Sequence, residues 1–197
     1  MLIRNAISLL GALILFSISP SPAWASHQYG LHILTDSRYF DTSKYYVKIF
    51  PPAGYPPNSD CMHTWHVPPN EVRLNATFTE LTLYIEDKDS TTCGGEPKYN
   101  TWDYQIWKYQ TINGAEQRVG LGSFQFYHYR IDGEWYTSII PRNLDGMPMH
   151  RPSVGIVTCH SNKLVKTNCR NKPTQGKDAA DNIYIYFRWP VNEDFNL

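Results

Sequence analysis

The sequence has no excess of charge of either sign. Lysine and arginine together number 18, and so do aspartate and glutamate, which gives a formal net charge of zero. Proteins that bind nucleic acid or acidic surfaces usually carry a basic patch that tracks the phosphates. The balance therefore argues against nucleic acid as a partner.

Long apolar runs are absent after residue 25. No later segment approaches the roughly 18 consecutive apolar residues of a membrane-spanning helix, so we expect no membrane span. The N-terminus differs, because Arg4 precedes an apolar stretch over residues 6–18 that is too short to span a bilayer. Ala23-Trp24-Ala25 follows as an A-x-A cleavage signal. The sequence predicts a signal peptide over residues 1–25, one domain over residues 26–197, and a secreted or periplasmic protein.

Catalytic motifs are also missing. No G-x-S-x-G nucleophile elbow occurs, since Gly122-Ser123-Phe124 lacks the pattern. A pair of carboxylates for glycoside hydrolysis could be drawn from Glu86, Glu96, Asp103 or Glu134, but sequence does not give their separation. We therefore assign no catalytic residue, and whether the protein is an enzyme stays open.

Cysteines are few, and their number is even. The four are Cys61, Cys93, Cys159 and Cys169. In an exported chain such a set predicts two disulfides, with three possible connectivities. We favour Cys61–Cys93 and Cys159–Cys169, because each bond ties a turn-rich segment to its neighbour. No C-x-x-C spacing points to a metal site, and we expect no metal and no cofactor.

Helical periodicity is nearly absent, and period-2 alternation of apolar residues dominates. Apolar side chains share one face at Val72, Leu74, Ala76 and Phe78, again at Leu81, Leu83 and Ile85, and again at Ile183, Ile185, Phe187 and Trp189. The apolar positions are even-numbered in the first run and odd-numbered in the second, which predicts a bulge or tight turn near Glu80. Weaker strands are expected over residues 30–35, 44–50 and 154–159.

Two dipeptides predict hairpins. Asn113-Gly114 and Asp132-Gly133 both suit a type I′ turn, and each is flanked by aromatic, alternating segments. The second turn would pair Arg130 with Trp135, His128 with Thr137 and Phe126 with Ile139. The first would pair Tyr109 with Arg118 and Ile106 with Leu121. Residues 102–140 should then form a three-stranded antiparallel meander.

These patterns together predict an all-β fold. About nine strands in one domain favour an antiparallel, jelly-roll-like β-sandwich. Four long segments, residues 51–70, 87–101, 141–152 and 161–181, lack strand patterning. Long loops in a compact domain often carry function, and the proposed disulfides anchor three of them. At the start of the second segment, Glu86-Asp87-Lys88-Asp89 closes a strand and opens the loop, and it reads as a solvated charged turn more readily than as a Ca²⁺ site.

Aromatic residues are abundant, with 14 Tyr, 6 Trp and 8 Phe. Such residues pack in half-buried strands, and they also stack on ligands. The candidates for ligand binding are Tyr55, Trp65, His66 and Trp102. Trp65 ranks first because it lies in a loop near Cys61. Trp102 could instead pack inside the meander and contact no ligand. His63 and His66 lie in a Pro-flanked loop, which favours two solvated histidines over a ligand cluster.

The sequence favours a secreted, non-catalytic protein that binds a carbohydrate or an extracellular protein surface through aromatic-rich loops. One alternative is an enzyme, possibly metal-dependent, that acts on an extracellular polymer. Another is an exported inhibitor or effector of a partner protein. The ligand, the organism and the oligomeric state are not specified by any feature of the sequence.

Overall fold

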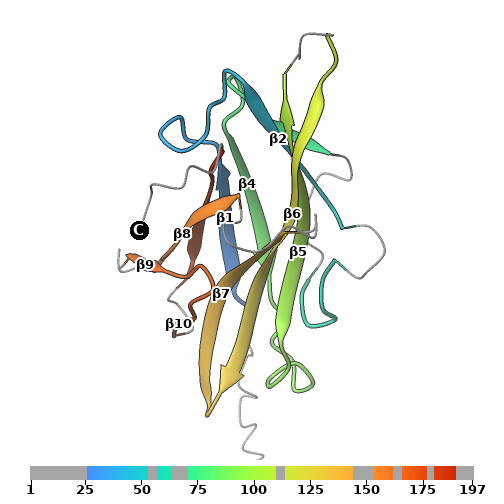
Figure 1. Ribbon diagram of the computed structural model, residues 1–197. Helices are drawn as coiled ribbons and strands as arrows, with labels where there is room; N and C mark the ends of the chain where they lie inside the picture. The colour runs from blue at the N-terminus through green and yellow to red at the C-terminus, as the bar shows by residue number, and fades with distance from the viewer. Residues whose placement is uncertain are drawn as a thin grey trace, which may run out of the picture.

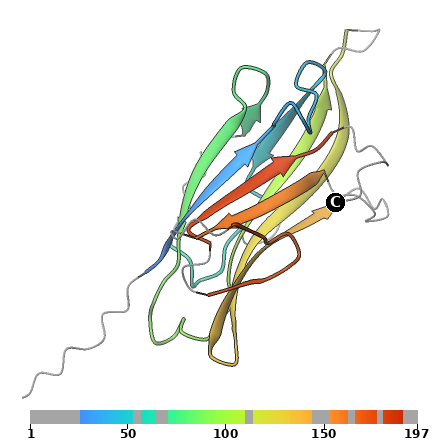
Figure 2. The same cartoon turned by 90° about the vertical axis from the view of Figure 1, so that its left-hand side faces the viewer.

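The computed structural model describes residues 26–52, 57–63, 71–109, 114–143, 153–161, 166–176 and 180–189. Within these ranges the chain forms eleven strands in two sheets and no helix (Figure 1). One sheet has the order β4-β1-β11-β8-β9, and the other has the order β10-β7-β6-β5-β2-β3. Figure 2 shows the first sheet in front of the second. The predicted β-sandwich is confirmed, and no helix in the described ranges is long and apolar enough to cross a membrane.

The strands are defined as follows. The five-stranded sheet contains β1 (Gln28–Leu34), β4 (Glu80–Glu86), β8 (Val154–His160), β9 (Lys166–Asn168) and β11 (Asn182–Phe187). The six-stranded sheet contains β2 (Tyr45–Phe50), β3 (Val72–Leu74), β5 (Lys98–Lys108), β6 (Gln117–Ile131), β7 (Glu134–Asn143) and β10 (Thr174–Gln175). Two more strands are seen than expected, because β9 and β10 are too short to show alternation.

The core lies between the two sheets. The five-stranded sheet contributes the fully buried side chains of Leu31 and Ile185, and the six-stranded sheet contributes those of Trp102 and Phe124. Alternate residues of each strand face this layer, as the pleat of a strand requires. β1 and β11 pair in parallel, with Leu31 opposite Ile183, whereas the other strand pairs described here are antiparallel.

The predicted meander is formed by β5, β6 and β7. Its second turn has positive φ at both central residues, 49° at Asp132 and 88° at Gly133, which is the type I′ geometry. The predicted register is confirmed: Arg130 pairs with Trp135, His128 with Thr137 and Phe126 with Ile139.

The other predicted hairpin is wrong. β5 ends at Lys108 and β6 begins at Gln117, so their connection is longer than two residues. A bulge follows Ile106, which pairs with Gly120 instead of Leu121. Tyr109 donates its backbone N–H to the carbonyl of Lys44 (2.9 Å) and therefore stays with the chain leading into β2. Asn113 lies outside the described residues.

The change of parity before β4 is a tight turn. The Asn75 side chain accepts the N–H groups of Thr77 and Phe78, each at 2.9 Å. Because this turn ends β3 at Leu74, the shared face expected to continue through Ala76 and Phe78 does not form, and Phe78 is exposed. The turn carries the chain from the six-stranded sheet to the five-stranded one.

Both predicted disulfides are present, Cys61–Cys93 and Cys159–Cys169. Cys169 lies between the sheets, because its N–H donates to Val157 of β8 and its carbonyl accepts from Ile139 of β7. Two disulfides in one small domain are typical of proteins from oxidising compartments.

The disulfides predict the state of the thiols. Because all four cysteines are paired, the intact native protein should weigh four hydrogens less than its fully reduced form. Peptide mapping should link Cys61 to Cys93 and Cys159 to Cys169. Labelling of any cysteine by a thiol reagent in the native protein would contradict this pairing.

The Asp132-Gly133 turn predicts a cost for a β-branched residue. Gly133→Val should lower the free energy of unfolding by about 1–2 kcal/mol, because φ of 88° strains an L side chain. Denaturant unfolding measures this loss. Gly95→Val is the control, since no heavy atom lies within 4 Å of a Cβ built there and its φ is not in the strained region. An equal loss in both variants would show that the turn geometry is not its cause.

Candidate functional site

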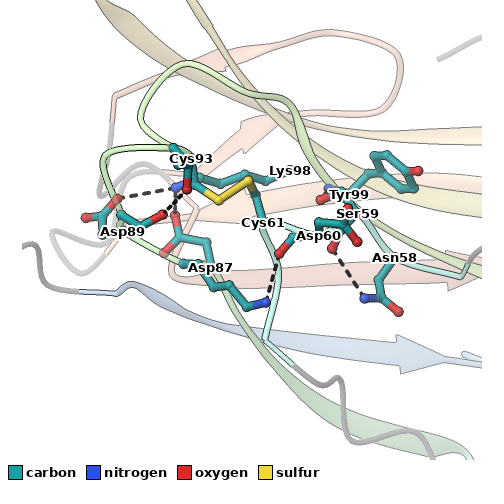
Figure 3. The surroundings of a disulfide bond; sticks show 12 residues. Asn58, Ser59, Asp60, Cys61, Asp87, Asp89, Cys93, Lys98 and Tyr99 are labelled. Atoms are coloured by element: carbon teal, nitrogen blue, oxygen red, sulfur yellow. Dashed lines mark hydrogen bonds and ion pairs between the residues drawn. A yellow bond between two sulfur atoms is a disulfide. The ribbon is translucent and has the colours of Figure 1, made fainter.

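A pocket of about 420 Å³ lies beside the Cys61–Cys93 disulfide. Figure 3 shows the surroundings of this disulfide. Its lining residues come from two segments that are distant in the sequence: Asn58, Ser59, Asp60 and Cys61 from one, and Glu96, Pro97 and Tyr99 from the other. The volume falls within the range of small-molecule sites in proteins. This pocket is the candidate site.

Backbone pairing builds one wall of the pocket. Residues 57–59 run along β5, where Ser59 donates its N–H to the carbonyl of Tyr99 (2.9 Å) and Thr101 donates to the carbonyl of Pro57 (2.7 Å). The Ser59 hydroxyl also accepts the N–H of Tyr99 at 3.2 Å. The disulfide then ties Cys61 to the loop that leads into β5. The wall is fixed by hydrogen bonds and by a covalent bond, which favours a preformed site.

A buried cluster of charges lies behind this wall. The Lys98 side chain is fully buried, and its Nζ lies 2.6 Å from Asp87 Oδ2 and 3.3 Å from Asp89 Oδ1 (Figure 3). The same ammonium lies 4.5 Å from the centre of the Trp135 ring. Asp87 is only 2% exposed, so the solvated charged turn expected from the sequence is wrong for this residue. Burial of these charges requires their pairing, and the pairing holds the loop after β4 against β5.

The pocket combines one aromatic ring with several hydrogen-bonding groups. Tyr99 and Asn58 are half-buried, whereas Asp60 and Glu96 are exposed. Among the described residues no lysine or arginine lines the pocket, and the Lys88 ammonium reaches only the backbone carbonyl of Asp60 (2.8 Å). The ring provides an apolar face, while the carboxylates and the amide oxygen accept hydrogen bonds. The arrangement suits a ligand with both C–H faces and hydroxyl groups.

Three further tyrosines extend this surface across the six-stranded sheet. Tyr127 of β6 is the cross-strand partner of Tyr99. The ring centre of Tyr129 lies 4.9 Å from that of Tyr127 and 5.9 Å from that of Tyr136 of β7. All four are half-buried. Their sequence neighbours Phe126 and His128 face the core, so the tyrosines face outward. We refer to Tyr99, Tyr127, Tyr129 and Tyr136 as the tyrosine row.

Of the four predicted ligand-binding residues, the structure describes only Trp102. Its side chain is fully buried and stacks on Phe124 with ring centres 5.4 Å apart, so it packs inside the meander and offers no ring face to a ligand. Tyr55, Trp65 and His66 lie outside the described residues. Their proposed roles stay predictions.

The candidate carboxylates are scattered. Glu96 lines the pocket, Glu86 contacts Ser26, Asp103 is buried, and Glu134 begins β7 beyond the Asp132-Gly133 turn. The carboxylate that accompanies Glu96 in the pocket is Asp60, which the sequence did not single out. Across the described ranges, no three His, Cys, Asp or Glu side chains converge closely enough to hold a metal ion.

Two signals in the sequence could have located the pocket. The predicted Cys61–Cys93 bond brings the segment that contains Asp60 close to the segment that contains Glu96. The alternation of β5 places Trp102, Tyr104 and Ile106 on one face and therefore Tyr99 on the other. Asn58 had no such signal, because it lies in a segment without strand patterning.

Comparisons with known proteins give no relative: no family model, no curated protein and no solved structure matches the chain. The site is therefore interpreted from its own chemistry.

The buried Lys98 predicts a large loss of stability when its charge is removed. Lys98→Met should lower the free energy of unfolding by about 3–5 kcal/mol, because it leaves buried carboxylates without their cation. Lys88→Met is the matched control, since that ammonium is only half-buried and donates to the backbone carbonyl of Asp60. Urea unfolding compares the two. Similar small losses in both variants would show that the Lys98 pairing contributes little to stability.

Proposed function

We propose that this protein is a secreted, non-catalytic binding protein that recognises a carbohydrate through the pocket beside Cys61–Cys93. One observation carries the proposal: a tyrosine ring and several hydrogen-bonding side chains line a single pocket whose wall is fixed by a disulfide. Preformed pockets with an apolar surface and a few polar groups are typical ligand sites. The predicted signal peptide and the two disulfides support export.

The chemistry of the lining favours a neutral sugar. A sugar ring presents C–H groups on its faces, which pack on an aromatic ring, and hydroxyl groups at its edge, which donate to carboxylates and amides. Asp60 and Glu96 would repel an anionic sugar, since the lining residues that the structure describes include no lysine or arginine and the nearby Lys88 ammonium already donates to the backbone carbonyl of Asp60. The tyrosine row offers further aromatic surface next to Tyr99, which suits a ligand longer than one sugar unit.

A hydrolytic enzyme is the second candidate, and one observation favours it. Asp60 and Glu96 both line the pocket, and glycoside hydrolases commonly use two carboxylates on either side of the scissile bond. In that function one group would protonate the leaving oxygen and the other would act as base or nucleophile.

The binding proposal predicts the effect of removing one ring. A glycan array identifies the ligand, and calorimetry then compares variants with the native protein. Tyr99→Ala should weaken binding about tenfold or more while leaving the Tm nearly unchanged, since the ring is half-exposed. Tyr84→Ala is the matched control, because Tyr84 is 51% exposed on the five-stranded sheet. An unchanged affinity in Tyr99→Ala would contradict the proposed site. Trp65→Ala, in the same assay, tests the residue ranked first from the sequence.

Two further measurements separate the classes of ligand and of function. Binding of a neutral sugar should weaken little at about 0.5 M salt, where the Debye length falls to roughly 4 Å, whereas a steep loss would indicate a charged partner. Incubation of the bound oligosaccharide with the protein should leave it intact. Cleavage products that disappear in Glu96→Gln would instead establish the hydrolase.

A further inference from the structure

Ser26 and His27 lie against the end of β4. The last paired residues of β1 and β4 are Gln28 and Glu86. Beyond them, His27 donates its backbone N–H to Asp87 Oδ1 (2.6 Å), and Asp87 returns its N–H to the carbonyl of His27 (3.0 Å). The Ser26 hydroxyl donates to Glu86 Oε1. Residues 26 and 27 therefore prolong β1 beside two consecutive carboxylates.

These two carboxylates differ in how far they are neutralised. Asp87 is buried, and its second oxygen accepts the Lys98 ammonium. The Glu86 side chain is 41% exposed, and its one ion-pair contact among the described residues is a distant one, with His63 Nε2 4.0 Å from Glu86 Oε1. Glu86 can therefore accept a stronger cation at neutral pH.

We propose that Glu86 binds the N-terminal ammonium group that cleavage between Ala25 and Ser26 would create. The inference rests on the predicted signal peptide and is independent of ligand binding in the pocket. Hydrolysis of the Ala25–Ser26 peptide bond consumes one water. Ala25 leaves with the new carboxylate, and the nitrogen of Ser26 becomes an amine that takes up a proton at neutral pH. A signal peptidase, a protease of the export pathway, supplies the catalysis.

Geometry places this new charge beside Glu86. The amine and the hydroxyl of Ser26 share one Cα, so the amine lies within one side-chain length of the atom that already contacts Oε1. Before cleavage the nitrogen is a neutral amide with one N–H. After cleavage it carries three N–H groups and a full positive charge, and a charge-assisted hydrogen bond to a carboxylate is roughly twice as strong as a neutral one.

The pair would strengthen the same unit that forms the pocket wall. The carbonyl of Glu86 accepts the N–H of His63 (2.8 Å), and Lys88 donates its N–H to the carbonyl of Cys61 (2.9 Å). Residues 61–63 and 86–88 are thus held together, and Asp60 and Cys61 of the pocket lie at one end of this unit. Removal of the leader then adds a contact to the segment that carries the disulfide.

The test compares four forms of the chain over residues 26–197: free amine or acetylated Ser26, each with Glu86 or with Glu86→Gln. Acetylation removes the charge and leaves the rest of the chain unchanged. It should lower the Tm by about 1–4 °C in the Glu86 background at low salt and should have no effect in Glu86→Gln. In 0.5 M salt the difference should shrink. Glu80→Gln, at the other end of β4, is the matched control and should retain the full effect of acetylation.

Three results would overturn the proposal. The first is an equal effect of acetylation with and without Glu86, the second is no effect in either background, and the third is N-terminal sequencing of exported protein that begins at a residue other than Ser26. None of these results bears on Tyr99 and the glycan assay. Failure of the N-terminal site and failure of the proposed carbohydrate site are therefore distinguishable.

Discussion

Successive side chains of β5 point to opposite faces of its sheet, and this alternation separates the core of the protein from the candidate site. Lys98, Trp102 and Tyr104 face inward and are fully buried. Tyr99 lies between them in the sequence and therefore faces outward, into the pocket. A register slip of one residue would exchange the two faces, exposing an indole and a buried ammonium while burying the ring proposed to bind the ligand.

The Lys98 ion pairs add a second constraint on the same strand. Aliphatic side chains at all three positions of the cluster could fill the space with less desolvation, so the complete set of ion pairs contributes little net stability, although removal of Lys98 alone is costly. Its pairing with Asp87 and Asp89 instead ties the first residue of β5 to the loop after β4. Both the Cys61–Cys93 bond and the hydrogen bonds of residues 57–59 meet at this point. We infer that the ion pairs specify the position of the loop, and hence the shape of the pocket.

Local rules predicted the parts of this structure that local interactions determine. The Asp132-Gly133 turn followed from the φ preferences of its two residues, and its register followed from the alternation of apolar side chains. The two disulfides followed from the even number of cysteines. The Asn113-Gly114 hairpin failed because Tyr109 pairs with the chain before β2, a long-range contact that no dipeptide encodes. Trp102 could not be assigned to the core or to a ligand without knowing which face of β5 is covered. The buried state of Asp87 was missed for a related reason, since its cation lies eleven residues away in another element.

The candidate site is formed by loop segments that are fixed to the strands of the sandwich. Binding residues need loops for their variety of side chains and a rigid scaffold for their geometry. Residues 57–61 and the turn before β5 have almost no regular structure. Backbone hydrogen bonds nevertheless hold residues 57–59 to β5, and the disulfide joins Cys61 to Cys93 in the turn. Ordering these segments before the ligand arrives removes an entropic cost from binding. If the pocket binds the proposed ligand, that cost has already been met in the folded protein, and more of the contact energy of Tyr99 and the surrounding acceptors is then available for affinity.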